Sequence, residues 1–139
     1  MAVVTKELEV VTRGENDVVD ITEKVRKAVR EARLGGGVVT VFVPGSTAAV
    51  TTMEFEPGLV RDFPEMLERA APRNREYEHQ KAWSDGNGHS HVKAALVGPS
   101  LTVPFVNGDL TLGTWQQVVL VELDIRPRTR RVVLQIVGE

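Results

Sequence analysis

The sequence predicts a single α+β domain in which a mixed or antiparallel sheet packs against two to three helices. In the first half of the chain, short runs of β-branched residues alternate with segments of helical periodicity, whereas the second half holds successive strand-like runs. The length of 139 residues suits one domain, 1–139, that buries roughly two-thirds of its unfolded surface. No repeat, low-complexity tract or linker divides the chain.

The first predicted element is a strand over residues 2–12, where Val, Thr and Leu dominate. Arg13–Asp17 has the composition of a turn. Asp20 then stands where its carboxylate accepts from a first-turn N–H of a helix over 21–34. Gly35–Gly37 is expected to end that helix, because glycine is free of the φ < 0 restriction. The helix is predicted from apolar residues at helical spacing: Ile21, Val25, Ala28, Val29 and Ala32.

Two strands and a second helix follow. Val38–Val43 is continuously apolar, which predicts a strand buried on both faces, and Ala48–Met53 resumes as a strand after a break. Glu56-Pro57 has the form of a helix start with proline in the first turn. Pro64 lies inside the helical pattern and predicts two short helices or a kinked one. The apolar face of this region consists of Leu59, Val60, Phe63, Met66, Leu67 and Ala70.

The second half of the chain is predicted to be mostly strands. A helix begins at about Ser90 and ends at Gly98-Pro99. Its apolar positions are Val92, Ala95 and Leu96. Asn107-Gly108 is a strong signal for a tight hairpin. The strands predicted around and after this turn are 102–106, 110–112, 115–123 and 131–137.

Composition excludes several classes of function. There is no cysteine, so disulfides, thiolate nucleophiles and cysteine-ligated metals are excluded. The net charge of −2 provides no global field for nucleic acid. The N-terminus lacks the pattern of a signal peptide, and no apolar run approaches the ~20 residues of a membrane span. These features predict a soluble, cytoplasmic protein without nucleic-acid or membrane partners.

All three histidines, His79, His89 and His91, lie within thirteen residues. Together with Asp85 they suit general acid–base chemistry, or a divalent metal such as Zn²⁺ or Mg²⁺ with the three histidines as ligands. The spacing differs from that of a helical His-x-x-x-His metal site. The alternative is that they are loop histidines that cap a helix or bind backbone.

A glycine-rich turn, Asp85–Gly88, lies in the middle of the histidine segment. It lacks the alternating carboxylates and the terminal glutamate of a calcium-binding EF-hand loop. Because it leads into a helix N-terminus, Asn87 and Gly88 are candidates for binding an anion.

Six further positions are candidate site residues. Ser46 and Thr47 lie in the break between two strands and either line a pocket or form an ordinary turn. Glu54 is a candidate acid or base, or a carboxylate near a helix start. Gln116 opens an apolar strand, where its amide needs a partner. The run Arg126–Arg131, which includes Arg128 and Arg130, is a solvated turn or a phosphate site.

Several motifs in order resemble the YjbQ-like family, often labelled secondary thiamine-phosphate synthase. They are Trp83–His91, Leu96–Ser100, Val103-Pro104, Asn107-Gly108, Leu112–Gln116, Glu122 and Arg128–Arg130. The resemblance implies a compact α+β fold, a homotrimer, and pockets near the subunit interfaces lined by the histidine-rich motif. It also implies functional roles for the three histidines, Asp85 and Asn87.

The chain departs from the family pattern at two places. Gly45 stands where family members usually carry the histidine of a His-Thr-Ser-Ala motif, and Met53-Glu54-Phe55 retains only Glu54 of an Asn-Glu-Asn motif. If that histidine is a ligand or a proton carrier, its loss weakens, changes or removes the activity.

The resemblance implies an enzyme that joins a pyrimidine pyrophosphate to a thiazole phosphate and releases pyrophosphate. Arg128, Arg130, the amides near Asn87 and a divalent metal are expected to neutralise the leaving group. His89, His91, Asp85 and Glu54 are the expected catalytic residues, and Ser46, Thr47, Gly88 and Gln116 the expected remaining contacts to substrate. Two alternatives stay open: metal-assisted hydrolysis of a phosphorylated metabolite, and a non-catalytic module that binds a small anion.

Overall fold

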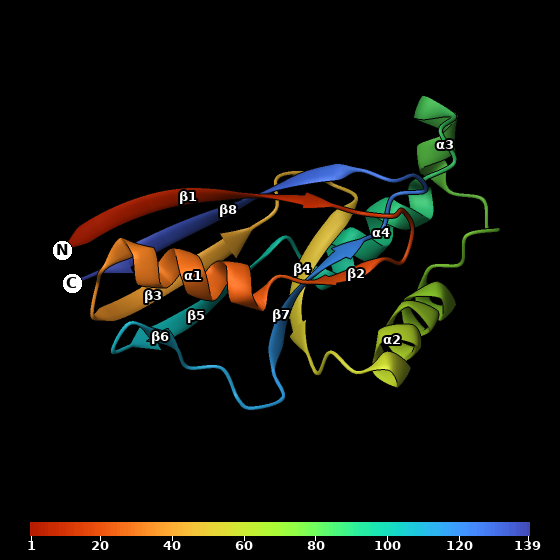
Figure 1. Cartoon of the computed structure of the whole chain (residues 1–139). Helices are drawn as coiled ribbons and strands as arrows, with labels where there is room; N and C mark the ends of the chain where they lie inside the picture. The colour runs from red at the N-terminus through yellow and green to blue at the C-terminus, as the bar shows by residue number, and fades with distance from the viewer.

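Two antiparallel sheets form the body of the protein in the computed structural model, which describes residues 1–139 (Figure 1). The strands are β1 (Ala2–Val11), β2 (Val18–Asp20), β3 (Gly36–Phe42), β4 (Ala48–Met53), β5 (Ser100–Val106), β6 (Asp109–Leu110), β7 (Gln117–Glu122) and β8 (Thr129–Gly138). The helices are α1 (Thr22–Ala32), α2 (Pro57–Ala70), α3 (Glu78–Trp83) and α4 (Gly88–Val97). The predicted single α+β domain is confirmed, with four helices rather than two or three and with every strand pair antiparallel.

The larger sheet has the strand order β1-β8-β3-β5-β6, and the smaller has the order β2-β7-β4. The first and last strands pair along their whole length, from Ala2 opposite Gly138 to Val11 opposite Thr129, so both chain termini lie at one end of the molecule. Helices α2, α3 and α4 gather at the other end (Figure 1). Candidate site residues near α4 are therefore remote from the termini.

Strand β7 separates two hydrophobic clusters, because its side chains alternate between them. Val118 and Leu120 join the larger cluster, where α1 contacts strands of both sheets, and Val119 and Val121 join the smaller one, beside α2 and α4. All four are fully buried. The strand predicted over 115–123 is therefore present and is buried on both faces, as expected of a continuous apolar run.

Strand β3, predicted to be buried on both faces, is buried on only one. Val39 and Val41 are fully buried, whereas Val38 is 38% exposed and Phe42 is 41% exposed. The continuous apolar run did not reveal this, because β3 lies between β8 and β5 in a sheet with one open face. The prediction was wrong because apolar side chains on the open face make the run resemble a strand that is buried on both faces.

Gly35–Gly37 were predicted to end the first helix, but they do not. The helix ends at Ala32, and Arg33 adopts the left-handed conformation with φ 56°. Gly36 and Gly37 instead belong to β3, where Gly37 lies opposite Gly138 of β8. A Cβ atom on Gly37 would lie 2.0 Å from the carbonyl oxygen of Val137. The glycine is needed for close strand approach rather than for helix termination.

Helix α2 begins as predicted and continues past Pro64. The Glu56 carboxylate caps it by accepting from the N–H groups of Gly58 and Leu59, both at 2.8 Å. The predicted division into two short helices is absent, since a single helix spans Pro57–Ala70 with Pro64 buried inside it. Burial of Pro64 and Leu67 outweighs the backbone hydrogen bond that proline cannot make.

Helix α4 buries polar residues and exposes apolar ones, the reverse of its predicted orientation. His89, Ser90 and Lys93 are fully or almost fully buried, whereas Val92 is 46% exposed and Leu96 is 64% exposed. Periodicity identified the helix but assigned the wrong face to the core. The buried polar face is what brings the histidine segment into the interior.

The remaining elements are a hairpin, a short strand and a short helix. The hairpin at Asn107-Gly108 is confirmed, with φ 52° and 75°, the left-handed pair that a two-residue hairpin needs. Strand β2 and helix α3 were not predicted, since each is shorter than the window in which periodicity is visible. No helix has the length and apolar character needed to cross a membrane.

Candidate functional site

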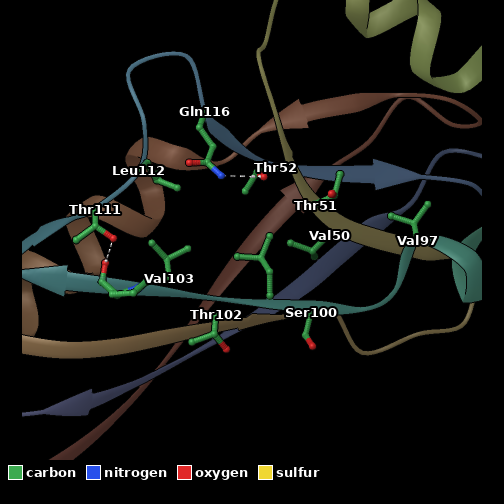
Figure 2. A pocket seen from close by; sticks show the side chains of 12 residues that line it. Val50, Thr51, Thr52, Val97, Ser100, Thr102, Val103, Thr111, Leu112 and Gln116 are labelled. Atoms are coloured by element: carbon green, nitrogen blue, oxygen red, sulfur yellow. Dashed lines mark hydrogen bonds between the residues drawn. The ribbon is translucent and has the colours of Figure 1, made fainter.

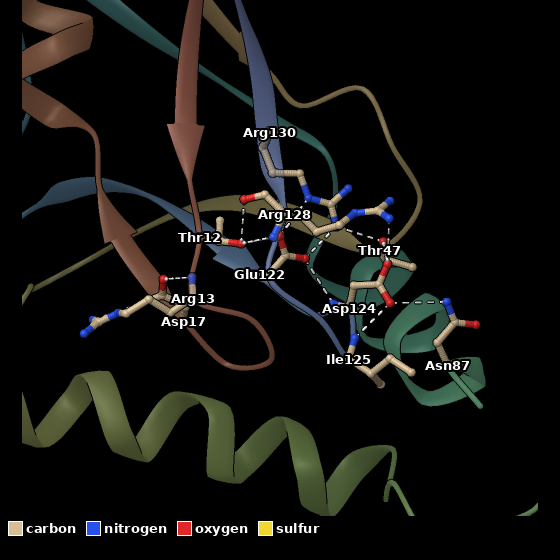
Figure 3. Close-up of polar contacts among 10 residues, drawn as sticks. All are labelled: Thr12, Arg13, Asp17, Thr47, Asn87, Glu122, Asp124, Ile125, Arg128 and Arg130. Carbon is tan, nitrogen blue, oxygen red and sulfur yellow. Dashed lines mark hydrogen bonds and ion pairs between the residues drawn. The ribbon is translucent and has the colours of Figure 1, made fainter. Parts of the chain in front are cut away.

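Three connections meet at the end of the body that carries α4: the segment 44–47, the turn 84–87 and the segment 123–128 (Figure 3). The Leu123 N–H donates to the Thr47 carbonyl at 3.0 Å, which ties the first connection to the third. The Asn87 amide approaches Asp124, which ties the second to the third. Residues from distant parts of the chain are thereby brought into one cluster.

A buried ion pair between Arg130 and Glu122 forms the base of this cluster. The Arg130 Nε donates to Glu122 Oε1 at 2.9 Å, and Nη2 also reaches the carboxylate. Thr12 donates to the same Oε1 at 2.9 Å, and Thr47 accepts from Arg130 at 2.9 Å. Arg130, predicted to bind an anion, therefore already has a buried carboxylate partner, and its position suits holding Thr47 in place.

Thr47 in turn orients Asp124. Its hydroxyl donates to Asp124 Oδ2 at 3.1 Å, while the Ile125 N–H donates to Oδ1 at 2.8 Å. Burial by itself would raise the pKa of Asp124, but the hydrogen bonds from Ile125, Asn87 and Thr47 outweigh it and leave the pKa below its ordinary value. Asp124 is therefore a carboxylate at neutral pH. Arg128 lies 3.6 Å from its Oδ2.

His79 and His91 lie together on the other side of the turn. Their ring centroids are 4.4 Å apart, and His79 Nδ1 is 3.5 Å from Asp85 Oδ1. Burial, followed by the neighbouring His79, lowers the pKa of His91 below its ordinary 6.5. The His91 imidazole is therefore neutral at pH 7 and is able to accept a proton.

His89 is held in a different set of contacts. Its ring is fully buried, and Nε2 pairs with Glu15, which also pairs with Arg73 at 2.6 Å. Its Nδ1 is buried without a hydrogen-bond partner. No group of three or more His, Cys, Asp and Glu side chains is arranged to hold a metal ion. The predicted three-histidine metal site is therefore not assembled.

Lys93, one turn after His89, is a second buried charge that the sequence did not reveal as such. Only 1% of it is exposed, and its Nζ donates to Glu68 at 2.8 Å. Glu68 also accepts from the Arg73 N–H at 2.7 Å. The pair joins α4 to the C-terminal end of α2. A lysine in a helical pattern reads as a solvent-facing residue, so nothing in the sequence pointed to this contact.

The Glu68–Lys93 pair predicts a loss of stability in acid. The hydrogen bond from Lys93 lowers the pKa of the Glu68 carboxyl below its ordinary 4.5. The pair therefore contributes fully above about pH 4.5, and the contribution is lost as the pH falls through the lower pKa of the folded state. We expect the free energy of unfolding, measured by urea denaturation, to fall more steeply for the wild type than for Glu68→Gln between about pH 5 and 3.

The matched control is Glu65→Gln on the same helix, where the carboxylate pairs with the exposed Arg69. This variant should follow the wild-type pH dependence. Parallel curves for the wild type and Glu68→Gln would contradict the assignment.

Gln116 lines a separate cavity of ≈ 320 Å³ between β4, β5 and the segment after β6 (Figure 2). Its amide donates to Thr52 at 3.2 Å and accepts from the Gly113 N–H at 3.0 Å, which are the partners that a polar residue there needs. None of the three histidines lines this cavity. The structure does not bring Gln116 together with the histidine segment.

The other predicted positions are placed as follows. Ser46 and Glu54 are exposed. Gly88 is buried at the start of α4, where an added Cβ would lie 2.6 Å from the Cβ of Tyr77. That contact makes Gly88 a packing residue between α3 and α4. Asp124 was missed by sequence reasoning, although a carboxylate directly after the apolar run of β7 is a signal that a buried charge has partners.

Comparison with known proteins settles the relationship. A family model described as UPF0047 protein YjbQ-like matches residues 6–139. The chain belongs to the UPF0047, YjbQ-like family. A UPF0047 protein of Archaeoglobus fulgidus is 40% identical over 129 residues, which span 93% of this chain and 98% of that protein.

Solved structures agree with this membership. A YbjQ-like protein from Sulfolobus solfataricus P2, described as of unknown function, has a TM-score of 0.93 and 32% identity over 99% of both chains. A hypothetical protein from Aeropyrum pernix K1 has a TM-score of 0.90 and 35% identity, covering 97% of this chain and 98% of that one. The resemblance predicted from the motifs is confirmed for family and fold. The reaction of this UPF0047 protein stays a prediction.

Position 45, where the resemblance implies a histidine, borders the buried ion pair. A Cβ atom on Gly45 would lie 3.1 Å from Arg130 Nη1, and Gly45 has φ +142°, a conformation that side chains other than glycine rarely adopt. A histidine here would require a different backbone conformation in segment 44–47. Glycine at position 45 therefore also leaves the approach to Arg130 free of a side chain.

Proposed function

We propose that this UPF0047 protein is a small-molecule enzyme that acts on a phosphorylated substrate beside α4, with the condensation of a pyrimidine pyrophosphate and a thiazole phosphate as the specific reaction. The proposal rests on one observation, a continuous series of contacts from Arg128 to His91. Arg128 approaches Asp124, Asp124 contacts Asn87, and Asn87 contacts Asp85. The series ends where Asp85 approaches His79 and the His79 ring packs against the His91 ring.

The series combines a cation that reaches solvent with acid–base groups. Arg128 is 31% exposed at its side chain, so its guanidinium is available to a phosphate oxygen. His91 presents a neutral imidazole and His79 a second ring beside a carboxylate. Such a combination suits binding of a phosphorylated metabolite more than binding of an apolar one.

The proposed condensation needs charge neutralisation above all. The thiazole nitrogen uses its lone pair to form the new C–N bond, and pyrophosphate departs with the electron pair of the broken C–O bond. No proton is lost from the thiazole in that step. Negative charge gathers on the departing pyrophosphate, and Arg128 is the partly exposed cation of the cluster that is able to stabilise it.

The test compares two arginines of the same segment. Arg128→Ala should lower kcat/KM for pyrophosphate release from the two substrates about ten- to hundredfold, because one charge-assisted hydrogen bond is worth about 1.5–3 kcal/mol. Arg126→Ala, at an exposed position two residues earlier, should stay within about twofold of the wild type. Equal activity of the two variants, or no condensation product with the wild type, would refute the proposal.

Gly45 favours a second candidate, a non-catalytic module that binds a small anion. The position that carries a histidine in the related motif holds no side chain here, while Arg128 and the buried network remain. This candidate predicts binding of inorganic pyrophosphate by calorimetry without turnover, and unchanged binding in His91→Ala. If the wild-type gene complements a thiamine auxotroph and the His91→Ala gene does not, the non-catalytic candidate is ruled out.

The proposed assembly is a homotrimer. Its support is the exposed apolar surface on both the open sheet face and α4, the latter from Val92 and Leu96. An apolar helix face that a single chain leaves in water is typical of a subunit interface. Light scattering during gel filtration should give about three times the 15.3 kDa chain mass, and Leu96→Glu should lower that mass.

A further inference from the structure

We infer that residues 74–86, which include helix α3, form a lid over α4 that opens to admit a polar ligand and closes on it. Figure 1 shows α3 at the edge of the molecule, beside α4 and apart from both sheets. The nature of the ligand, a phosphorylated metabolite, rests on the proposed function, whereas the opening of the lid does not.

The lid is fastened to the rest of the protein only at its two ends. Before it, Arg73 pairs with Glu15 at 2.6 Å, and the Arg73 N–H donates to Glu68 at 2.7 Å. After it, Asn87 is buried at the N-terminus of α4. No hydrogen bond or ion pair joins the lid to any residue outside 72–87. The lid is therefore able to separate from α4 without breaking a hydrogen bond to the body of the protein.

Hydrophobic packing also holds the lid only weakly. None of its residues belongs to either hydrophobic cluster, and no residue of α3 is buried. Tyr77 and Gln80 lie against Gly88 at the start of α4. The His79 ring packs against the His91 ring, with the centroids 4.4 Å apart. Because closure buries little apolar surface, it gains little free energy from the hydrophobic effect.

Closure also leaves polar atoms buried without partners. The side-chain atoms of the protein in this state are His79 Nδ1, Gln80 Oε1, His89 Nδ1 and Ser90 Oγ. The first two lie in the lid, and the other two lie in the first turn of α4. A buried nitrogen or oxygen without a hydrogen bond is costly, because it has lost its bonds to water. Opening returns His79 and Gln80 to water, which offsets the loss of the contacts that opening breaks.

A ligand with hydrogen-bonding groups supplies partners that the closed lid lacks. Such a ligand favours the closed state, because a ligand shifts an equilibrium toward the conformation that it binds better. The lid also adjoins the proposed substrate site. Asp85 in the lid approaches His79, and Asn87 directly after the lid approaches Asp124, the partner of Arg128. Closure over this site would separate a bound substrate from water.

Gly88→Ala tests the lid without a ligand. The added methyl group would lie 2.6 Å from the Tyr77 Cβ and 2.7 Å from Gln80 Oε1, so it forces the lid away from α4. Once separated, α3 is a helix of 6 residues without tertiary support and should unfold. We expect the α3 amides to exchange with deuterium about tenfold faster or more than in the wild type. The urea midpoint should stay within about 0.2 M of the wild-type value, because the body of the protein stays folded.

Gly37→Ala is the matched control, because its methyl group would also overlap a neighbouring segment, but within the β3–β8 pairing. This variant should lower the urea midpoint clearly. Equal losses of midpoint in Gly88→Ala and Gly37→Ala would overturn the lid, since α3 would then be an integral part of the fold. The lid is also overturned if the α3 amides of the wild type exchange as slowly as those of β7, because both would then open only by global unfolding.

Inorganic pyrophosphate tests closure on a ligand. At millimolar concentration it should slow deuterium exchange of the wild-type α3 amides about fivefold or more, and it should leave the β7 amides unchanged. An unchanged rate in α3 would overturn closure on a phosphorylated ligand. A lid that opens and closes as expected, in a protein that forms no condensation product, would contradict the proposed reaction alone.

Discussion

Replacement of Glu122 by alanine should lower the free energy of unfolding by about 3–5 kcal/mol, because it leaves the buried Arg130 guanidinium without its counter-charge. Glu122 is fully buried and Arg130 is only 5% exposed, so water cannot take over the lost contacts. The Thr12 hydroxyl loses its carboxylate acceptor in the same step. Urea denaturation followed by circular dichroism measures the change.

The control removes a carboxylate from a neighbouring arginine at the surface. Glu7 pairs with Arg131 at 3.0 Å, but both side chains are more than half exposed. Glu7→Ala should therefore cost less than about 1 kcal/mol.

A double variant, Glu122→Leu with Arg130→Met, distinguishes the effect of losing the ionic contact from the effect of losing side-chain volume. It should recover much of the stability lost in Glu122→Ala, since buried ion pairs are often replaceable by apolar groups of similar size. A cost below 1 kcal/mol for Glu122→Ala would contradict the account of this pair.

Replacement of Gly37 by alanine should cost roughly 3 kcal/mol or more, because the new methyl group would overlap backbone atoms that cannot move aside cheaply. An added Cβ would lie 2.0 Å from the Val137 carbonyl oxygen and 2.7 Å from the Cα of Gly138. Gly37 also has φ +157°, in a region that alanine rarely adopts. The β3–β8 pairing would have to open locally.

Gly36→Ala is the matched control one residue earlier in the same strand. A Cβ there would meet only the Phe105 carbonyl oxygen, at an ordinary 3.7 Å. We expect less than about 1 kcal/mol of destabilisation, within the range of a benign surface substitution. Similar losses for the two variants, measured by urea denaturation, would show that strand propensity rather than close approach sets the cost.

Much of the fold could be predicted from the sequence because its signals are local. The α1 helix, the helix start at Glu56-Pro57 and the Asn107-Gly108 turn each depend on residues a few positions apart, and each prediction was confirmed. The face of an element that meets the core depends instead on its neighbours in space. For that reason the outer side chains of β3 and the apolar side of α4 were assigned to the interior, although both face outward.

In the candidate site too, residue types could be predicted from the sequence but contacts in space could not. The histidine segment and Arg128 were singled out from the sequence, because all three histidines lie within thirteen residues and four arginines lie within six. Which of these residues lie together could not be predicted, because His89 contacts Glu15 while His79 and His91 pack against each other. Asp124, which links Arg128 to Asn87, lies 37 residues from Asn87 and becomes its neighbour only through folding.

By itself the sequence determined the class of fold, the family and the kinds of chemistry available: imidazole, carboxylate, amide and guanidinium, without any thiol. Only the tertiary structure decided which of these groups share a site. It divided the three histidines between two sets of contacts, and it placed the Asn87 amide between two carboxylates. The physical reason is that composition and periodicity are local, whereas hydrogen bonding and ionic contacts depend on which strands and helices the packed core brings together.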